Sequence, residues 1–207
     1  MSNFGYKFML INKITMRKLK LQIHMTIDGF VGNANGEMDW VTFNWDDELR
    51  NYSVTNLDQV DCILMTLGHN SKMNFIPYWA SVAENKSDPN FVLGKKLTDI
   101  PKIVFSRTLT ISKWANTKMI NGDIVEEIIK LKKQKGNDII VYGGARFAST
   151  LIRHRLIDEF HLLINPVAIG SGLSIFKELD SKQNLTLEKA RQFDCGIVVL
   201  HYEPKCK

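Results

Sequence analysis

Two adjacent glycines separate a buried segment from a predicted helix. Residues 138–142 read Asp-Ile-Ile-Val-Tyr, which is typical of a short strand inside a parallel sheet, and Gly143 and Gly144 follow directly. Glycine lets the backbone approach an anion closely, and the first N–H groups of a helix carry a partial positive charge. The pattern therefore suits a phosphate site, to which Arg146 could add a contact. A tight turn without a ligand explains it equally well.

Hydroxyl and guanidinium groups follow another predicted strand. Ser106, Arg107 and Thr108 come directly after a segment that ends at Phe105 and is typical of a buried strand. Ligands of open α/β sheets bind at the carboxyl ends of the strands. Two hydroxyls and a guanidinium fork at such an end suit a phosphomonoester. The same three residues also suit a polar turn without a ligand.

Three weaker signals also follow predicted strands. Asp28 ends the first strand, where its carboxylate could bind a substrate amide or amine, relay a proton, or serve only as a turn residue. Gly68 and His69 end the second strand. Residues 166–172 (Pro-Val-Ala-Ile-Gly-Ser-Gly) pass into a glycine-bounded turn whose backbone could approach a flat ring. An ordinary loop explains this last segment equally well.

Other catalytic motifs are absent from the sequence. It contains no HExxH, GxxxxGK[ST], GxSxG or aspartate-rich calcium loop, and the paired glycines are not a GxGxxG fingerprint. The three cysteines form no CxxC pair, so we expect Cys62 and Cys195 to be buried, unreactive thiols rather than parts of a disulfide or zinc site. No metal site is expected, because four histidines lack sequence neighbours at ligand spacing: His69, His154, His161 and His201.

Strand and helix patterns alternate along the chain. Residues 19–25 alternate between apolar and polar side chains, as in a strand with one polar side, on which His24 would lie. Asp123 with Glu126 resembles a helix-capping box. Further strands are expected near residues 60–67, 102–106, 138–142, 160–164, 185–187 and 197–202, and further helices over residues 46–57 and after Gly144. This order predicts a three-layer α/β fold, with helices on both faces of a mixed, mostly parallel sheet and an antiparallel C-terminal edge.

The composition indicates a single globular domain. The 207 residues include 27 basic and 22 acidic side chains, and 44% are hydrophobic, enough for a full core. The net charge of +5 comes from interspersed residues without a basic stripe, so we expect no nucleic-acid partner. Residues 1–15 are expected to be a tail outside a domain at residues 16–207. Because no segment resembles a membrane span or a signal peptide, we expect a cytoplasmic protein without a membrane partner.

Several short motifs, in a fixed order, resemble those of one family. They are Thr26-Ile-Asp-Gly-Phe, Gly36-Glu-Met-Asp-Trp40, residues 101–109, Gly122-Asp123, residues 140–145 and residues 156–162. Each motif is weak, but the ordered set is similar to the dihydrofolate-reductase-like family that includes the RibD C-terminal domain, the reductase half of bifunctional riboflavin-biosynthesis proteins. The chain most resembles the stand-alone bacterial members, and its length leaves no room for the deaminase half.

The resemblance implies NADPH-dependent hydride transfer to a small heterocycle, such as a pterin, a folate or an aminopyrimidine. The implied cofactor contacts are Gly143, Gly144 and Ala145 with Arg146 for the pyrophosphate, Ser106, Arg107 and Thr108 for the adenosine 2′-phosphate, and Ile169, Gly170 and Gly172 for the nicotinamide end. Asp28 and Trp40 would face the substrate. The resemblance also implies a cis peptide between the two paired glycines.

One implied cofactor contact departs from the family pattern. Gly68-His69 stands where the family has Gly-Arg, and a neutral imidazole lacks the permanent charge that a guanidinium offers a 2′-phosphate. A preference for NADPH over NADH therefore depends more on Arg107. Because family members often pair, we expect a homodimer. The alternative hypothesis is a protein that binds a dinucleotide or a pterin with the same fold but without turnover.

Overall fold

The computed structural model describes residues 16–41, 44–66, 75–106 and 109–205. Its strands are β1 (Leu19–Thr26), β2 (Val60–Thr66), β3 (Lys102–Phe105), β4 (Thr117–Ile120), β5 (Asp138–Val141), β6 (Glu159–Asn165), β7 (Leu185–Gln192) and β8 (Val198–Pro204). Its helices are α1 (Asp47–Thr55), α2 (Phe75–Glu84), α3 (Phe91–Asp99), α4 (Ile124–Lys132) and α5 (Ala145–Arg153). The predicted tail at residues 1–15 and the predicted site residues Gly68, His69, Arg107 and Thr108 lie outside these described residues.

The strands join in one sheet, in the order β4-β3-β2-β5-β1-β6-β8-β7. The pairs from β4 to β6 are parallel, and β8 is antiparallel to both β6 and β7. The register places Leu21 of β1 between Val141 of β5 and Phe160 of β6, and all three side chains are fully buried. The predicted mostly parallel sheet with an antiparallel C-terminal edge is confirmed.

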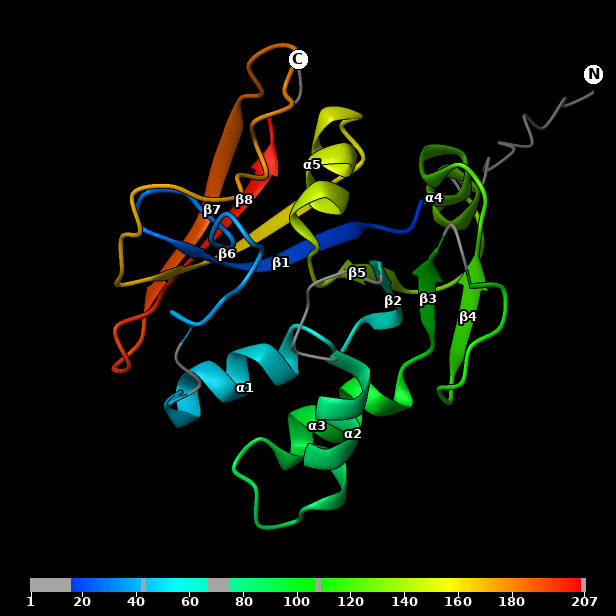
Figure 1. Ribbon diagram of the computed structural model, residues 1–207, viewed down its shortest axis with the longest axis horizontal. Coiled ribbons are helices and arrows are strands. Elements are labelled where there is room, and N and C mark those ends of the chain that lie inside the picture. The colour runs from blue at the N-terminus through cyan, green and yellow to red at the C-terminus, as the bar shows by residue number, and fades with distance from the viewer. Residues whose placement is uncertain (1–15, 42–43, 67–74, 107–108, 206–207) are drawn as a thin grey trace, which may run out of the picture.

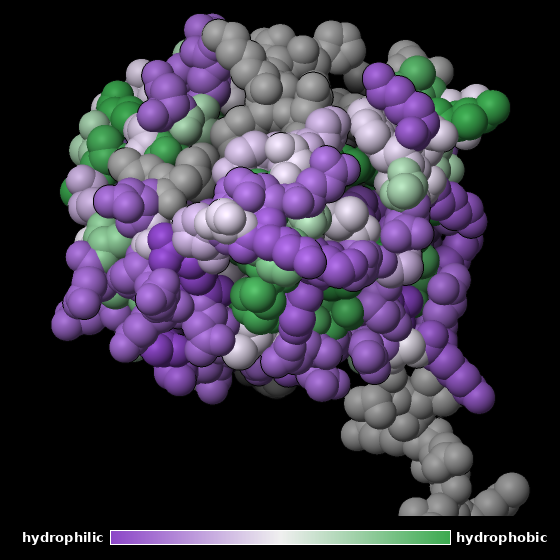
Figure 2. Space-filling model, turned by 90° about the horizontal axis from the view of Figure 1, so that it is seen from below, coloured by the Kyte–Doolittle hydropathy of each residue, from purple (hydrophilic) through white to green (hydrophobic). Residues whose placement is uncertain are grey.

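Helices cover both faces of this sheet (Figure 1). α4 and α5 lie on the upper face in this view, where Phe147 and Leu151 of α5 pack in one core cluster with Leu21. α1, α2 and α3 lie on the lower face, where Leu49 and Trp79 pack in a second cluster. Figure 2 shows that the outer surface of the lower face is mostly hydrophilic, as expected of helices that bury one side. The predicted three layers are therefore present.

Two helices begin at aspartates that the sequence marked as helix starts. The Asp46 carboxylate accepts a hydrogen bond of 2.7 Å from the Leu49 N–H, and the Asp123 carboxylate accepts one of 3.0 Å from the Glu126 N–H. Each bond satisfies an N–H group that has no partner inside the helix. None of the helices in the described part of the chain is long and apolar enough to cross a membrane.

β1 has the polar side that its alternation predicts, and this side is buried. Lys20 and Gln22 are only 8% and 5% exposed, because β1 is a central strand and α1 covers this face. The Lys20 ammonium lies 2.9 Å from a carboxylate oxygen of Asp138, and the Gln22 side chain accepts a hydrogen bond of 2.6 Å from Asn56. Such partners reduce the cost of burying polar groups. Alternation along the strand identified its two faces but not what covers them.

Candidate functional site

The predicted site residues that are described follow the carboxyl ends of parallel strands, at one edge of the sheet. Across this edge, Ser106 follows β3, Gly143 and Gly144 follow β5, Asp28 follows β1, and residues 169–172 follow β6. Neighbouring strands lie about 4.8 Å apart, so the four steps from β3 to β6 cover roughly 19 Å. This row has the length for an extended ligand such as a dinucleotide.

The chain reverses its direction across the sheet in the middle of this row. From β1 the chain crosses to β2 over the face that carries α1, whereas from β5 it crosses to β6 over the face that carries α5. The carboxyl ends of β1 and β5 therefore lie side by side, with loops that leave toward opposite faces. Open α/β sheets bind their ligands outside such a switch point.

The two glycines after β5 form the left-handed turn that leads into α5. Their φ angles are 77° for Gly143 and 55° for Gly144. Gly144 is the N-cap of α5, and because it has no side chain it cannot accept a hydrogen bond from the first N–H groups of the helix. A Cβ atom on Gly144 would lie 2.8 Å from the Thr66 hydroxyl oxygen, so the backbone passes close to the end of β2. These are the features of an anion cradle at a helix start.

The peptide between these glycines is trans, which corrects the expected cis peptide. No peptide bond between described residues is cis. Positive φ angles at both Gly143 and Gly144 make the turn instead, and no side chain opposes them. The assignment of the pyrophosphate to this turn therefore depends on the open helix start and no longer on a cis backbone. Ala145 is the first residue of α5, and the Arg146 side chain next to it is exposed.

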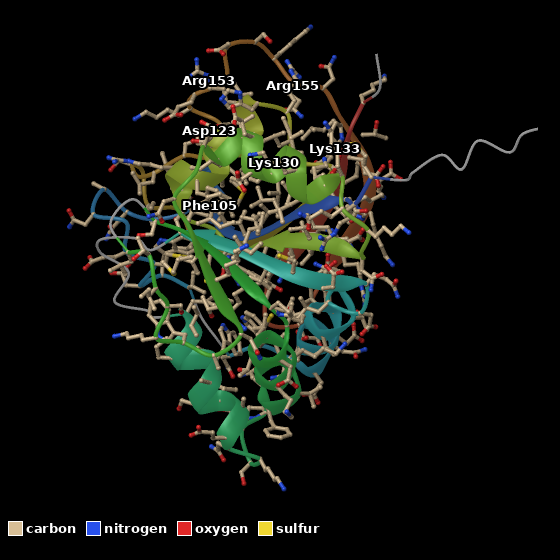
Figure 3. The ribbon with its side chains drawn as sticks, turned by 90° about the vertical axis from the view of Figure 1, so that its right-hand side faces the viewer. Phe105, Asp123, Lys130, Lys133, Arg153 and Arg155 are labelled. Carbon is tan, nitrogen blue, oxygen red and sulfur yellow. The ribbon has the colours of Figure 1, made fainter. Side chains whose placement is uncertain are left out.

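An aromatic contact holds the start of α5 beside the end of β3. The rings of Phe105 and Phe147 lie 5.3 Å apart, and Phe105 lies below the helices of the upper face (Figure 3). Ser106 follows immediately; its N–H donates to the Ile120 carbonyl over 3.0 Å, and its hydroxyl accepts from the Leu109 N–H over 2.9 Å. The Ser106 hydroxyl thus lies in the row of strand ends and also stabilises the turn after β3.

Asp28 connects the loops that follow β1 and β6. One carboxylate oxygen accepts hydrogen bonds from the N–H groups of Ile169, over 3.1 Å, and Gly170, over 2.7 Å. The other accepts from the Thr26 hydroxyl. The Thr26 hydroxyl, followed by these two backbone N–H groups, holds the pKa of Asp28 below its ordinary value, although the side chain is exposed. Asp28 is thus an ionised group that positions the predicted nicotinamide loop.

The loops that follow β1 and β6 also contact each other at Gly32 and Gly172. A Cβ atom on Gly172 would lie 2.2 Å from the carbonyl oxygen of Gly32, closer than any real contact. That carbonyl accepts a hydrogen bond of 2.8 Å from the Leu173 N–H, and the Val31 N–H donates to the Leu173 carbonyl over 2.8 Å. Glycine at position 172 is needed for this close approach.

Trp40 offers a hydrogen-bond donor without an acceptor. Its ring is half-buried, and its buried Nε1–H has no hydrogen-bond partner within the part of the chain that the structure describes. Asn165, at the end of β6, is 1% exposed and has an equally unpartnered side-chain oxygen, while its nitrogen bonds His24 and two backbone carbonyls. Buried polar atoms without partners point to a missing ligand or water.

Sequence reasoning missed Thr66 and Asn165, although both have a usable signal. Each is a polar residue at the last position of a buried strand, which is the position that faces the ligand edge of a parallel sheet. The described residues also line a cavity of about 170 Å³ beside α1 and one of about 510 Å³ at the amino ends of β2, β3 and β4. Neither cavity is lined by a residue that we predicted to bind cofactor or substrate.

Comparisons with known proteins relate this sequence to one family model and to several proteins. A family model described as the RibD C-terminal domain matches residues 17–199. The uncharacterized protein YyaP of Bacillus subtilis (strain 168) is 35% identical over 196 residues, which cover 93% of this chain and 98% of that protein.

Two solved structures have a similar fold. One is a diaminohydroxyphosphoribosylaminopyrimidine deaminase/5-amino-6-(5-phosphoribosylamino)uracil reductase from Thermotoga maritima, with a TM-score of 0.65 and 20% identity over 92% of this chain and 57% of that one. The other is a pyrimidine reductase-like protein from Corynebacterium diphtheriae, with a TM-score of 0.56 and 13% identity over 98% of this chain and 97% of that one.

Proposed function

Because the chain belongs to the RibD C-terminal domain family, we propose that it is an NADPH-dependent reductase of a small heterocycle, either a pterin- or folate-like ring or an aminopyrimidine. The observation that carries the proposal is the row of loops at the carboxyl edge of the sheet, which crosses the switch point between β5 and β1. A row of roughly 19 Å, from four strand spacings of about 4.8 Å, suits a dinucleotide better than a single mononucleotide.

The start of α5 is the proposed pyrophosphate site. Gly143, Gly144 and Ala145 present backbone N–H groups at the positive end of the helix, and the exposed Arg146 is close enough in sequence to add a charged contact. NADPH bound along the edge would supply the hydride. The protein's own contribution is to hold the two rings against each other and to exclude water between them.

The adenosine 2′-phosphate is assigned to the turn after β3. Ser106 lies at the end of the row that is opposite the predicted nicotinamide loop at residues 169–172. Arg107 and Thr108 follow Ser106 in the sequence. Since His69 replaces the arginine of the family pattern, Arg107 would carry the discrimination between NADPH and NADH. We therefore expect Arg107→Ala to weaken NADPH binding more than NADH binding. Equal losses would locate the 2′-phosphate elsewhere.

The substrate is assigned to the loops around Asp28 and Trp40. The ionised Asp28 carboxylate accepts hydrogen bonds, and the Trp40 Nε1–H donates one, so together they suit a ring that carries both an N–H group and a carbonyl or ring nitrogen. Pterins and aminopyrimidines have this combination. Asp28 carries no proton at neutral pH, and we propose that it orients the substrate while solvent supplies the proton of the reduction.

Nucleotide binding and substrate turnover test this proposal in sequence. NADPH should raise the melting temperature of the full chain, because a ligand that binds only the folded state stabilises it. NADPH oxidation should then be followed against a panel of pterins, folates, pyrimidines and quinones. Acceleration by a pterin or pyrimidine supports the proposal, whereas no thermal shift with NADPH or NADH removes it.

The second candidate function is a protein that binds a dinucleotide or a pterin without turnover. One observation favours it: the described carboxylate at the site, Asp28, is ionised and already accepts three hydrogen bonds. NADPH binding without oxidation across the whole panel would support this alternative.

Nucleic-acid binding is disfavoured on the surface labelled in Figure 3, because basic side chains there pair with acidic ones. Lys130 pairs with Glu127, and Arg153 pairs with Asp180.

We also propose that the chain forms a homodimer through its C-terminal strands. β7 is an edge strand, and six of its eight residues are exposed, including Leu187 at 50%. An uncovered edge strand is a ready site for pairing with another chain. The molar mass in solution tests this: twice the 23.7 kDa of the chain supports the dimer, and a monomer at micromolar concentration contradicts it.

A further inference from the structure

A cluster of ligand-type side chains lies under α1, away from the carboxyl ends of the strands. His161 of β6 and His201 of β8 are directly opposite each other in the antiparallel ladder. Glu159 is two residues before His161 and therefore on the same face of the strand. Glu159 and His161 are buried, and the His201 side chain is 25% exposed. Three side chains from two strands, up to 42 positions apart in the sequence, thus meet at one point.

The three side chains can offer donor atoms to one ion. The Glu159 Oε2 atom lies 3.2 Å from Nε2 of His161 and 3.8 Å from Nε2 of His201, and a set of one donor atom from each residue lies within 4.8 Å. Ligands about 2.0–2.2 Å from a Zn²⁺ ion in tetrahedral geometry are separated by similar distances. The other Glu159 oxygen is bonded by Lys18 over 2.6 Å, so Oε2 is the oxygen left for an ion.

A second observation points to a missing ligand at the same place. The Nε2 atom of His201 is buried and has no hydrogen-bond partner among the described residues. A buried polar atom without a partner is costly and uncommon in a native fold. The cavity of about 170 Å³ beside α1 is lined by both histidines, with Tyr52 and Asn56 on its α1 side. This space can hold water molecules that complete a coordination shell.

The surroundings of His161 match the second layer of a metal site. Its Nδ1 atom lies 2.6 Å from the Tyr52 hydroxyl, which fixes the orientation of the ring. Metal-binding histidines commonly use their other nitrogen for such a bond. With Nε2 bound to an ion, Nδ1 carries the ring proton and donates it to the Tyr52 hydroxyl oxygen.

We propose that Glu159, His161 and His201 bind one divalent transition-metal ion of the Zn²⁺ class. Two imidazoles and one carboxylate suit Zn²⁺, Co²⁺ or Ni²⁺, whereas Mg²⁺ and Ca²⁺ prefer oxygen ligands alone. The site lies about 13 Å from the carboxyl edge, since His161 is four residues of about 3.3 Å from the end of β6. It is therefore separate from the proposed reductase site. Its ion would connect β6 and β8 beneath α1.

Two features of the metal-free structure set the strength of this binding. The imidazole rings are stacked, with centroids 4.4 Å apart and planes 16° from parallel, so their lone pairs do not yet converge. His201 must turn, and its Nε2 atom has no hydrogen bond to lose. The ammonium groups of Lys18 and Lys20 lie 2.6 Å and 3.9 Å from Glu159 oxygens and repel a cation. We therefore expect micromolar rather than nanomolar affinity.

The test is calorimetric titration of the chelator-treated full chain with ZnCl₂, repeated with MgCl₂. We expect one Zn²⁺ per chain and no Mg²⁺ binding. His201→Gln should weaken Zn²⁺ binding at least about tenfold, by loss of one imidazole ligand. His154→Gln, which alters an exposed histidine after α5, should leave it unchanged. The melting temperature of each variant without metal shows whether it remains folded.

A charge variant keeps the proposal falsifiable if the histidine variant is unstable. Lys18→Met removes a half-exposed ammonium from the neighbourhood of Glu159 and should tighten Zn²⁺ binding about tenfold, a gain that general damage would not produce. CoCl₂ should give a visible absorption band that is lost in His201→Gln. Equal Zn²⁺ affinities for wild type and folded His201→Gln, or weaker binding by Lys18→Met, would overturn the proposal.

Discussion

Replacing Gly172 with alanine would force apart the two loops at the proposed substrate end of the site. The added Cβ would lie 2.2 Å from the Gly32 carbonyl oxygen, a backbone atom that cannot rotate away. Moving that carbonyl breaks its bond with the Leu173 N–H and disturbs the bond from Val31 to Leu173. At about 1 kcal/mol for each hydrogen bond, with some loss of packing, we expect Gly172→Ala to destabilise the protein by about 2–3 kcal/mol.

Equilibrium unfolding in urea, followed by circular dichroism, measures this cost. Gly170→Ala is the matched control, because nothing lies within 4 Å of its added Cβ and its φ of 73° costs alanine about 1–2 kcal/mol. Gly172→Ala should also weaken NADPH binding more than the control does, since its loop is displaced. If Gly172→Ala unfolds at the same urea concentration as the wild type, the close contact with Gly32 is wrong.

Three further predictions concern His24, Asp28 and Cys62. Burial lowers the pKa of His24 to about 4, so between pH 6.5 and 4 only the unfolded chain takes up this proton. Stability should therefore fall by about 2 kcal/mol from pH 7 to pH 5 in urea unfolding, with a smaller fall in His24→Gln. Asp28→Ala should weaken NADPH binding about tenfold in calorimetry by releasing Gly170 and its loop, and Asp28→Asn, which keeps one acceptor oxygen, should weaken it less. Burial raises the pKa of Cys62 to about 11, so this thiol should react with a disulfide reagent only after unfolding; rapid reaction in the folded protein would contradict its burial.

Local patterns in the sequence were sufficient to predict the central strands. The apolar run at residues 139–142 with the two glycines after it indicated β5, the turn and the start of α5, and the alternation of residues 19–25 indicated β1. α2, α3 and β4 were not predicted. β4 is a four-residue edge strand, and the cap of α3, Asn90, makes no side-chain bond to the helix, so neither carries a strong local signal.

The site was predictable only where it depends on strand ends. That Asp28 follows β1 is visible in the sequence, but its bonds to Ile169 and Gly170 join positions about 140 residues apart and follow from the pairing of β1 with β6. The spacing of histidines along the chain does not indicate a metal site. Glu159 and His161 share a strand face at spacing two, and only the register of β6 with β8 adds His201.

Calorimetric titration of the full chain with NADPH tests the central claim most directly, with Gly144→Ala measured in parallel. The wild type should bind one NADPH per chain. Gly144→Ala should bind it at least about tenfold more weakly, because alanine opposes the φ of 55° and its Cβ meets the Thr66 hydroxyl at 2.8 Å. Absence of binding by both NADPH and NADH, or equal NADPH affinity in the folded variant, would contradict the assignment of the carboxyl edge as a dinucleotide site.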